Sequence, residues 1–278
     1  MTAMRYGVMR HIERVRHHLA VEVDDANGAA LSTWALEANA IVFTRDGAVR
    51  GPDGAILVDP VTGDPAPGAQ IPYLADALRR KTATERDLAA LGIHVPPSLP
   101  PIVSDMEVEL RAASEVADRC LALFACALRA ETLATSPPPM PPAEILARLP
   151  RAKPAMSPRE RAFLHDEQPG DQDVIDHVWC YESLALLAWS LCLVPELPFP
   201  TSLCDVAIAR EARLRPTEEI LDALDRHYRI HWAVTEARVN GGAPAPDVEP
   251  GVVVERHRAL NWLTRFEDAE WDEVDTPT

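Results

Sequence analysis

Charged side chains inside apolar helical segments are the residues of this sequence best suited to chemistry. Glu182 lies within VIDHVWCYESLALLAWSLCLV, residues 174–194, which is apolar on almost every face of a helix. An unpaired carboxylate is costly there, so Glu182 must face a pocket, carry a proton or meet a cation. Three arginines are candidate partners: Arg111, Arg229 and Arg256. We favour a buried ion pair that fixes helix packing, and the alternative is a pocket for acid–base chemistry or cation binding with the candidate catalytic residues Glu182, Arg229 and Asp225.

Two histidines have a spacing that is typical of metal ligands. His227 and His231 lie four residues apart on one expected helix, where two imidazoles can share a metal ion. The residues between them are Tyr228-Arg229-Ile230, which lack the glutamate that a zinc-protease helix needs as a general base. Histidines on amphipathic helices usually lie at the helix surface, and we favour that interpretation. The sequence therefore indicates no cofactor, with a divalent metal at His227 and His231 as the alternative.

Tryptophans concentrate in the second half of the chain. Five of the six lie between residues 179 and 271, each inside a dense helical motif. Large aromatic side chains dominate core packing, so we expect a shared hydrophobic core. The alternative is an aromatic ligand pocket, with these candidate residues: Trp179, Tyr181, Trp189, Trp232 and Trp262.

Several familiar catalytic motifs are absent from the sequence. It contains no G-x-S-x-G elbow, no Gly-rich phosphate loop and no dinucleotide fingerprint. The 12 glycines cluster in the expected hairpin and in Pro-rich loops. These observations argue against ATP or NAD chemistry of the familiar kinds, and they leave open whether the protein is an enzyme.

Composition constrains partners and location. The formal net charge is −16, which repels phosphate backbones and argues against nucleic-acid binding. The same charge would speed association with a basic protein partner, although solubility alone also explains it.

The longest strongly apolar run, residues 183–194, is shorter than the roughly 20 residues of a membrane-spanning helix. Five cysteines without zinc-type spacing fit reduced thiols in a cytoplasmic protein, and the oligomeric state is left open.

Hydrophobic periodicity and proline positions predict a mainly helical fold. Expected helices cover residues 107–131, 174–194, 218–239 and 252–266, with a further helix beginning at Ser157-Pro158-Arg159-Glu160. Proline-rich stretches at 136–142 and 243–250 separate them. The expected architecture is an all-α or mainly α multi-helix bundle.

The first 70 residues differ from the rest. Apolar runs there are separated by Arg45-Asp46-Gly47 and Pro52-Asp53-Gly54, and Asp-Gly is a hairpin signal. We expect one β-hairpin, with residues 40–49 paired to residues 55–58. The chain should therefore consist of an N-terminal extension, residues 1–70, and a helical domain, residues 71–278.

Five sequence blocks together resemble a bacterial family, domain of unknown function 4272. They are Arg111-x-x-x-Glu115-x-x-x-Arg119, Trp179-x-Tyr181-Glu182 continuing to Trp189, EILDALDRHYRIHW, ERHRALNWL and the closing WDEVDTPT. The resemblance covers roughly residues 78–276 and leaves the first 70 residues outside. It implies no activity, cofactor or catalytic residue.

Two functions fit these observations. The first is a non-catalytic interaction protein, such as an adaptor, inhibitor or immunity-type factor, whose acidic surface binds another protein. The second is an enzyme or small-ligand-binding domain that uses Glu182, Arg229 and the tryptophans. We favour the first because no recognisable catalytic constellation accompanies the charge.

Overall fold

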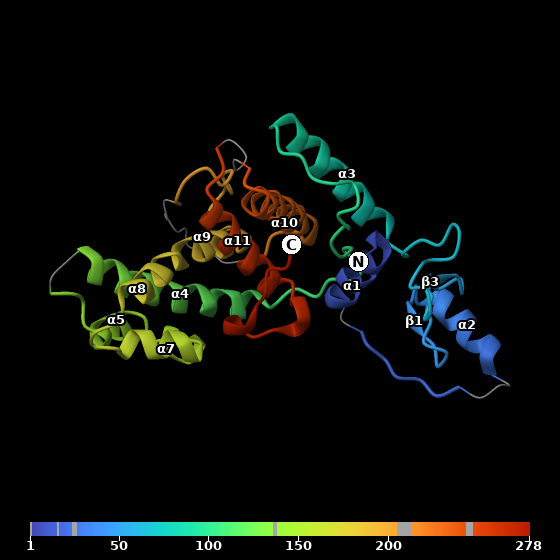
Figure 1. The fold of residues 1–278 in the computed structure, drawn as a ribbon. Helices are drawn as coiled ribbons and strands as arrows, with labels where there is room; N and C mark the ends of the chain where they lie inside the picture. Colours follow the sequence, from blue (N-terminus) through green and yellow to red (C-terminus); the bar gives the residue numbers. More distant parts are fainter. Residues whose placement is uncertain (1, 16, 24–26, 136–137, 205–212, 243–246) are drawn as a thin grey trace. The chain divides into compact units, whose positions relative to one another are not determined.

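The fold is mainly helical, with one small antiparallel sheet (Figure 1). The computed structural model describes residues 2–15, 17–23, 27–135, 138–204, 213–242 and 247–278. The chain divides into two compact units: unit 1 is residues 1–83 and 96–108, and unit 2 is residues 84–95 and 109–278. The expected mainly α fold is confirmed, while the domain boundary expected at residue 70 stays a prediction.

Unit 1 combines two complete helices and the sheet with the first part of a third helix. Its elements are α1 (Ala3–Arg14), α2 (Gly28–Glu37), β1 (Val42–Phe43), β2 (Val49–Arg50), β3 (Ile56–Val58) and the start of α3 (Ala75–Ala90). The Thr2 side chain accepts a hydrogen bond from the Arg5 N–H and so caps α1. Buried apolar side chains from these elements form its interior: Val8, Ala35, Ala48, Leu57 and Ala77.

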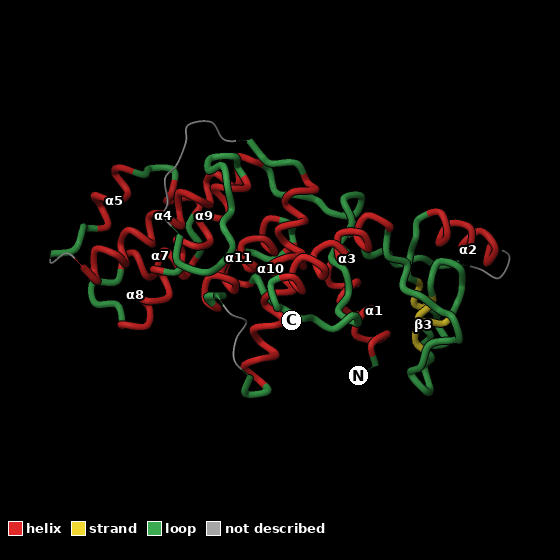
Figure 2. The backbone as a smooth tube through the Cα atoms, turned by 90° about the horizontal axis from the view of Figure 1, so that it is seen from above, coloured by secondary structure: helices red, strands yellow, loops and turns green. Residues whose placement is uncertain are grey.

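The sheet corrects the expectation of a single hairpin. Residues 40–49 do not form one strand, because the chain reverses at Asp46-Gly47 and β1 pairs antiparallel with β2. The Asp46 carboxylate accepts hydrogen bonds from the Ala48 N–H and the Thr44 hydroxyl, and Gly47 has a φ of 83°. A side chain at Gly47 would be strained in that backbone conformation. Strand β2 then pairs with β3, which gives the order β1-β2-β3. Figure 2 shows the strands in yellow near the label of β3.

Unit 2 contains the long helices. In chain order they are α4 (Ala113–Thr135), α5 (Pro142–Arg148), α6 (Ala152–Ala155), α7 (Pro158–His165), α8 (Asp171–Val178), α9 (Cys180–Ser190), α10 (Thr217–Val239) and α11 (Pro250–Leu263). Two 3-10 turns follow, η2 (Phe266–Asp268) and η3 (Trp271–Glu273). Helix α9 packs against both α4 and α11, and α11 packs on α10 (Figure 1). The core of unit 2 therefore surrounds α9 and α11.

Local capping signals explain several helix ends. Ser157 accepts a hydrogen bond from the Glu160 N–H while the Glu160 carboxylate accepts one from the Ser157 N–H, so the capping box expected at the start of α7 is confirmed. Helix α10 ends at Val239 with Asn240 as its C-cap, and Gly241 follows with a φ of 67°. Two expected Pro-rich breaks lie partly outside the described residues, at 136–137 and 243–246.

The expected single helix over residues 174–194 is wrong, because two helices meet at Trp179. Trp179 keeps helical backbone angles, but its carbonyl accepts a bond from the Glu182 N–H, a tighter i→i+3 turn. Helix α8 has no fully buried residue, whereas nine of the eleven residues of α9 are buried. The break therefore separates an exposed helix from a central one. No described helix is long and apolar enough to cross a membrane.

Candidate functional site

Glu182 belongs to a buried ion pair with Arg256. The Arg256 Nη2 and Nε atoms donate to Glu182 Oε2 at 3.0 and 3.2 Å, and both side chains are 1% exposed. The other carboxylate oxygen accepts from the Cys204 N–H. Arg256 also donates to the Pro198 carbonyl. Of the three candidate cations, the structure therefore selects Arg256, and the pair joins α9 to α11.

Arg229 and Asp225 form a second, separate ion pair. Arg229 donates to both Asp225 oxygens, at 3.0 and 2.9 Å, one turn apart on α10. Arg229 also donates to Glu85 at 3.1 Å, which connects α10 to the end of α3 that belongs to unit 2. Both Arg229 and Asp225 are completely buried. The three candidate catalytic residues are thus divided between two structural contacts.

The two candidate metal ligands have different partners. His227 Nδ1 donates to the Ala223 carbonyl at 2.8 Å, whereas His231 Nδ1 lies 3.0 Å from His257 Nδ1 on α11. Burial lowers the pKa of His227 to about 3 and that of His231 to about 4, so both are neutral near pH 7. Among the described residues, no group of three or more His, Cys, Asp and Glu side chains could hold a metal ion.

Four of the five sequence blocks that resemble the family contain a residue of a contact between an arginine and a tryptophan. The Arg111 guanidinium lies 4.4 Å from the Trp262 ring centroid, and Arg215 lies 4.8 Å from that of Trp189. Trp271 has two such neighbours, Arg119 at 4.9 Å and Arg258 at 4.8 Å. Cation–π contacts of this kind stabilise packing when the cation is desolvated. Trp262 and Trp271 also meet edge to face, with ring centroids 5.5 Å apart. These buried tryptophans therefore pack within the helical core.

The same arginines fasten residues 264–278, which we name the C-terminal segment. Arg111 donates to the Ala269 carbonyl at 2.8 Å, and Arg258 donates to that of Trp271 at 2.8 Å. Asn261 donates to the Asp275 carbonyl. Three residues in and beside η2 have positive φ angles: Arg265, Glu267 and Asp268. The closing WDEVDTPT block is thereby held against α4 and α11.

The other three residues of the expected aromatic pocket, Trp179, Tyr181 and Trp232, have different environments. The Tyr181 hydroxyl donates to Glu131 at 2.6 Å, and Trp232 is half-buried. The Trp179 ring packs over Gly251 at the start of α11, where an added Cβ would lie 2.5 Å from a ring carbon. Of the five expected pocket residues, only Trp179 lines the cavity described next.

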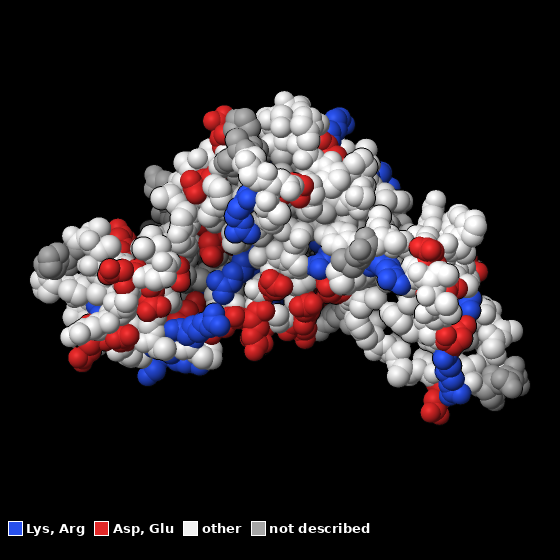
Figure 3. All heavy atoms as spheres, viewed as in Figure 1, with Lys and Arg blue, Asp and Glu red and all other residues white. Residues whose placement is uncertain are grey.

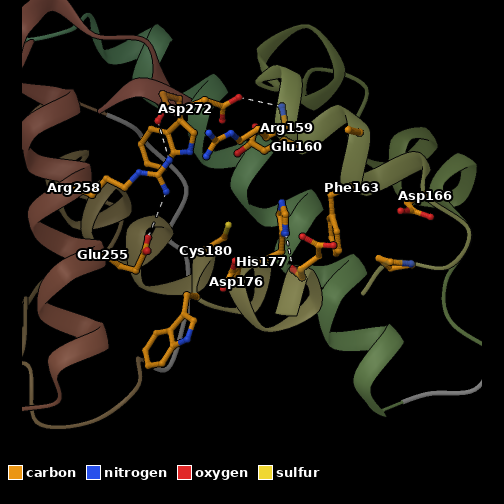
Figure 4. Close-up of a pocket in the computed structure, with 15 residues that line it drawn as sticks. Arg159, Glu160, Phe163, Asp166, Asp176, His177, Cys180, Glu255, Arg258 and Asp272 are labelled. Atoms are coloured by element: carbon orange, nitrogen blue, oxygen red, sulfur yellow. Dashed lines mark hydrogen bonds and ion pairs between the residues drawn. The ribbon is translucent and has the colours of Figure 1, made fainter. Parts of the chain in front are cut away.

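A cavity of about 600 Å³ lies in unit 2, between α7, α8, the start of α9, α11 and η3 (Figure 4). We name it the acidic cavity because six carboxylates line it and only two arginines do. The carboxylates are Glu160, Asp166, Asp173, Asp176, Glu255 and Asp272, and the arginines are Arg159 and Arg258. Flat aromatic surfaces also contribute, because the His177 ring stacks on Phe163 at a centroid distance of 3.7 Å. Trp179 and Trp271 complete the aromatic lining.

The buried carboxylates of the cavity differ in how well they are paired. Glu160 Oε2 accepts from Arg119 and from the Ser157 N–H, but Glu160 Oε1 has no hydrogen-bond partner among the described residues. Glu255 accepts from the Ser183 hydroxyl at 2.9 Å and lies 4.0 Å from Arg258. Burial raises the pKa of Glu255, because it disfavours the charged form of the carboxylate.

Two further carboxylates of the cavity accept hydrogen bonds from uncharged groups. Asp272 accepts from the Arg159 backbone N–H at 3.0 Å, and Asp176 accepts from Gln172 at 2.7 Å. Burial raises the pKa of the Cys180 thiol, which therefore stays protonated and is a poor nucleophile. The arrangement is suited to binding a cation and offers no activated nucleophile. The sequence patterns gave no indication of this site, although Asp173 and Asp176 lie three residues apart and so share one face of α8.

Comparisons with known proteins connect this geometry to one family. No curated protein matches the chain, and no solved structure matches it either. A family model described as domain of unknown function (DUF4272) matches residues 80–274. That range contains α4 to α11, the Arg–Trp contacts and the acidic cavity. The chain therefore belongs to the DUF4272 family.

Proposed function

We propose that this chain is a non-catalytic interaction protein, of the adaptor, inhibitor or immunity type, that binds a basic partner protein. The observation that carries the proposal is the contrast between two sets of charges in unit 2. Arg229 and Arg256 pair with the buried carboxylates of Asp225 and Glu182, whereas the acidic cavity has more carboxylates than arginines. A surplus of negative charge at an accessible cavity attracts a cationic partner.

The contacts of the candidate catalytic residues weigh against the enzyme alternative. Glu182 is 1% exposed and Asp225 is 0% exposed, and each accepts from an arginine. A general acid or base must come within hydrogen-bond reach of its substrate. Neither carboxylate lines the acidic cavity. The remaining polar groups at the cavity are suited to binding.

Surface charge supports the same proposal. The net charge of the whole chain is −16. On the face shown in Figure 3, acidic side chains lie over the α7 and α8 region and over the C-terminal segment, with basic side chains between them. A distribution of this kind raises the rate of association with a basic surface and makes that rate depend on salt. The proposal places the protein in the bacterial cytoplasm, where its five free cysteines would stay reduced.

The test is to isolate the partner and then reconstitute the complex. The tagged full chain is purified from cells that naturally contain it, and a stoichiometric partner is identified and produced separately. We expect that partner to be basic, and we expect the association rate constant to fall about tenfold or more between 50 and 500 mM NaCl. An acidic partner, a complex insensitive to salt or the lack of any stoichiometric partner would contradict the proposal.

A further inference from the structure

We infer that the acidic cavity receives an arginine side chain of the partner protein. This inference rests on the proposed function and adds the chemical group that is recognised. The cavity volume of about 600 Å³ lies within the range of ligand sites, roughly 300–1,000 Å³. It can therefore admit a guanidinium group together with part of the segment that carries it.

The unpaired carboxylate oxygen of Glu160, a residue that lines the cavity, is the first argument. Glu160 is 3% exposed, lines the cavity and leaves its Oε1 atom without a hydrogen-bond donor among the described residues. A buried carboxylate oxygen without a donor is costly. Its other oxygen already accepts from Arg119 and the Ser157 N–H, so the side chain is held in place. This oxygen is itself closed off from solvent, so a cation bound in the cavity would act on Glu160 through its charge and not through a direct hydrogen bond.

The charge balance of the cavity is the second argument. Arg119 neutralises Glu160, and Arg258 is the nearest cation to Glu255 at 4.0 Å. Arg159 is the other arginine of the lining, which also contains four further carboxylates: Asp166, Asp173, Asp176 and Asp272. The lining therefore retains a negative surplus. The pKa of Glu255 is raised chiefly by burial, and Asp176 and Glu182 add to that rise through their charge. A bound cation would offset that surplus.

The flat walls of the cavity favour a guanidinium over an ammonium group. His177 stacks on Phe163 with an interplanar angle of 5°, and Trp179 and Trp271 also line the space. Figure 4 shows Asp176 and His177 on one side of the cavity, with Glu255 and Arg258 on the other. A guanidinium is planar, stacks on aromatic rings and carries five N–H donors that can reach several carboxylates. An ammonium is compact and more strongly hydrated.

The first arm of the test measures binding of defined probes to the full chain by isothermal titration calorimetry. Three blocked pentapeptides differ only in their central residue, which is arginine, lysine or citrulline, and agmatine serves as a free guanidino compound. We expect the arginine peptide to bind about tenfold more tightly than the citrulline peptide, which lacks the charge. The lysine peptide should bind with intermediate affinity.

The second arm uses matched variants of the chain. The variant D173N/D176N removes two exposed carboxylates that line the cavity, and E167Q/D171N removes two exposed carboxylates nearby that do not. Both doubles change the net charge equally, so a nonspecific electrostatic effect would weaken binding equally in both. We expect the cavity double to lose about tenfold in affinity for the arginine peptide and the control double to lose less than about twofold.

The outcomes separate this inference from the proposed function. Arginine binding that depends on the cavity carboxylates supports the inference. Equal binding of all three peptides, or equal effects of the two doubles, overturns it while leaving the partner experiment to decide the proposed function. If agmatine binds at the cavity as tightly as the arginine peptide and no stoichiometric partner protein exists, the guanidinium site stands and the protein-interaction function fails.

Discussion

The ion pairs at the centre of unit 2 and the acidic cavity on its side use the same residue types in opposite ways. Around α9, α10 and α11, Arg229 and Arg256 bind carboxylates that are almost fully buried. In the cavity, carboxylates line a space of about 600 Å³ and include an oxygen of Glu160 without a described partner. The two regions therefore differ in whether their carboxylates are paired with arginines, and not in how many charged residues they contain.

That difference shows where function should be sought in this protein. A buried ion pair seldom adds much stability over an apolar pair, but losing one partner leaves a costly buried charge. Such pairs therefore fix the packing of helices. Partly paired carboxylates beside a cavity have another consequence, because a ligand can satisfy them. The charged residues that stand out in the sequence, Glu182 and Arg229, belong to the first kind.

Removing one partner of a central ion pair should produce the largest effect. Arg256→Ala would leave Glu182 charged and 1% exposed. We expect the free energy of unfolding to fall by about 3–5 kcal/mol, measured by urea denaturation followed by tryptophan fluorescence. The exposed pair of Arg148 with Glu144 provides the control, and Arg148→Ala should cost less than about 1 kcal/mol.

A double variant distinguishes loss of the pair from loss of packing. In E182Q/R256M the buried charge is gone, while the glutamine oxygen can still accept from the Cys204 N–H. It should therefore be more stable than Arg256→Ala alone. If Arg256→Ala and Arg148→Ala cost the same, the division between structural and available charges would be wrong.

Acidification should weaken unit 2 through its buried histidines. The pKa values of His227 and His231 are lowered mainly by burial, to about 3 and about 4, so the unfolded chain binds their protons first. As the pH falls from 6.5 toward 4, each histidine should reduce the free energy of unfolding by up to about 1.4 kcal/mol per pH unit. The raised pKa of Glu255 acts in the opposite direction.

The histidine contribution is isolated by comparing slopes. Urea denaturation of the native chain and of H227Q/H231Q between pH 7 and 4.5 gives the dependence of stability on pH for each. The double variant should show a shallower decline over that window, whatever its stability at pH 7. Parallel curves for the two proteins would show that burial does not lower the pKa of either histidine.

Trp271 tests whether Arg–Trp stacking holds the C-terminal segment. Its ring is 5% exposed and lies between Arg119 and Arg258. Trp271→Phe should lower the free energy of unfolding by about 1–2 kcal/mol, because a smaller ring fills less space and attracts cations less. Trp34 in unit 1 is 39% exposed, so Trp34→Phe should change the free energy by less than about 0.5 kcal/mol. Equal costs would mean that the stacking contributes little.

Sequence patterns predicted those parts of the fold that depend on local signals. The capping box at Ser157 and the end of α10 before Gly241 follow from a few neighbouring residues. Two expectations were wrong where a local turn outweighed the apolar pattern. Asp46-Gly47 divides the expected first strand, and a tighter turn at Trp179 divides the expected central helix.

The candidate site was beyond the reach of these patterns because it depends on tertiary packing. The sequence left three arginines as possible partners of Glu182, and only the position of α11 beside α9 selects Arg256. The acidic cavity needs α7, α8, α11 and η3 to converge, although Arg159 and Asp272, which line it, are 113 residues apart in the sequence. Single carboxylates such as Asp176 resemble ordinary exposed residues until that convergence is known.

The smallest effect on stability should come from the cavity carboxylates, and it would sharpen the contrast most. Asp173 and Asp176 are exposed on α8, and no described cation pairs with either. We expect D173N/D176N to change the free energy of unfolding by less than about 1 kcal/mol, because substitutions of exposed residues away from packed groups have small effects. Of the two, only Asp173 lies in the first turn of α8, where a carboxylate interacts favourably with the helix dipole. Urea denaturation beside E167Q/D171N measures this. A loss above about 2 kcal/mol would assign these carboxylates to the structural network, and only Asp166 and Asp272 would then remain as the surplus charge of the cavity.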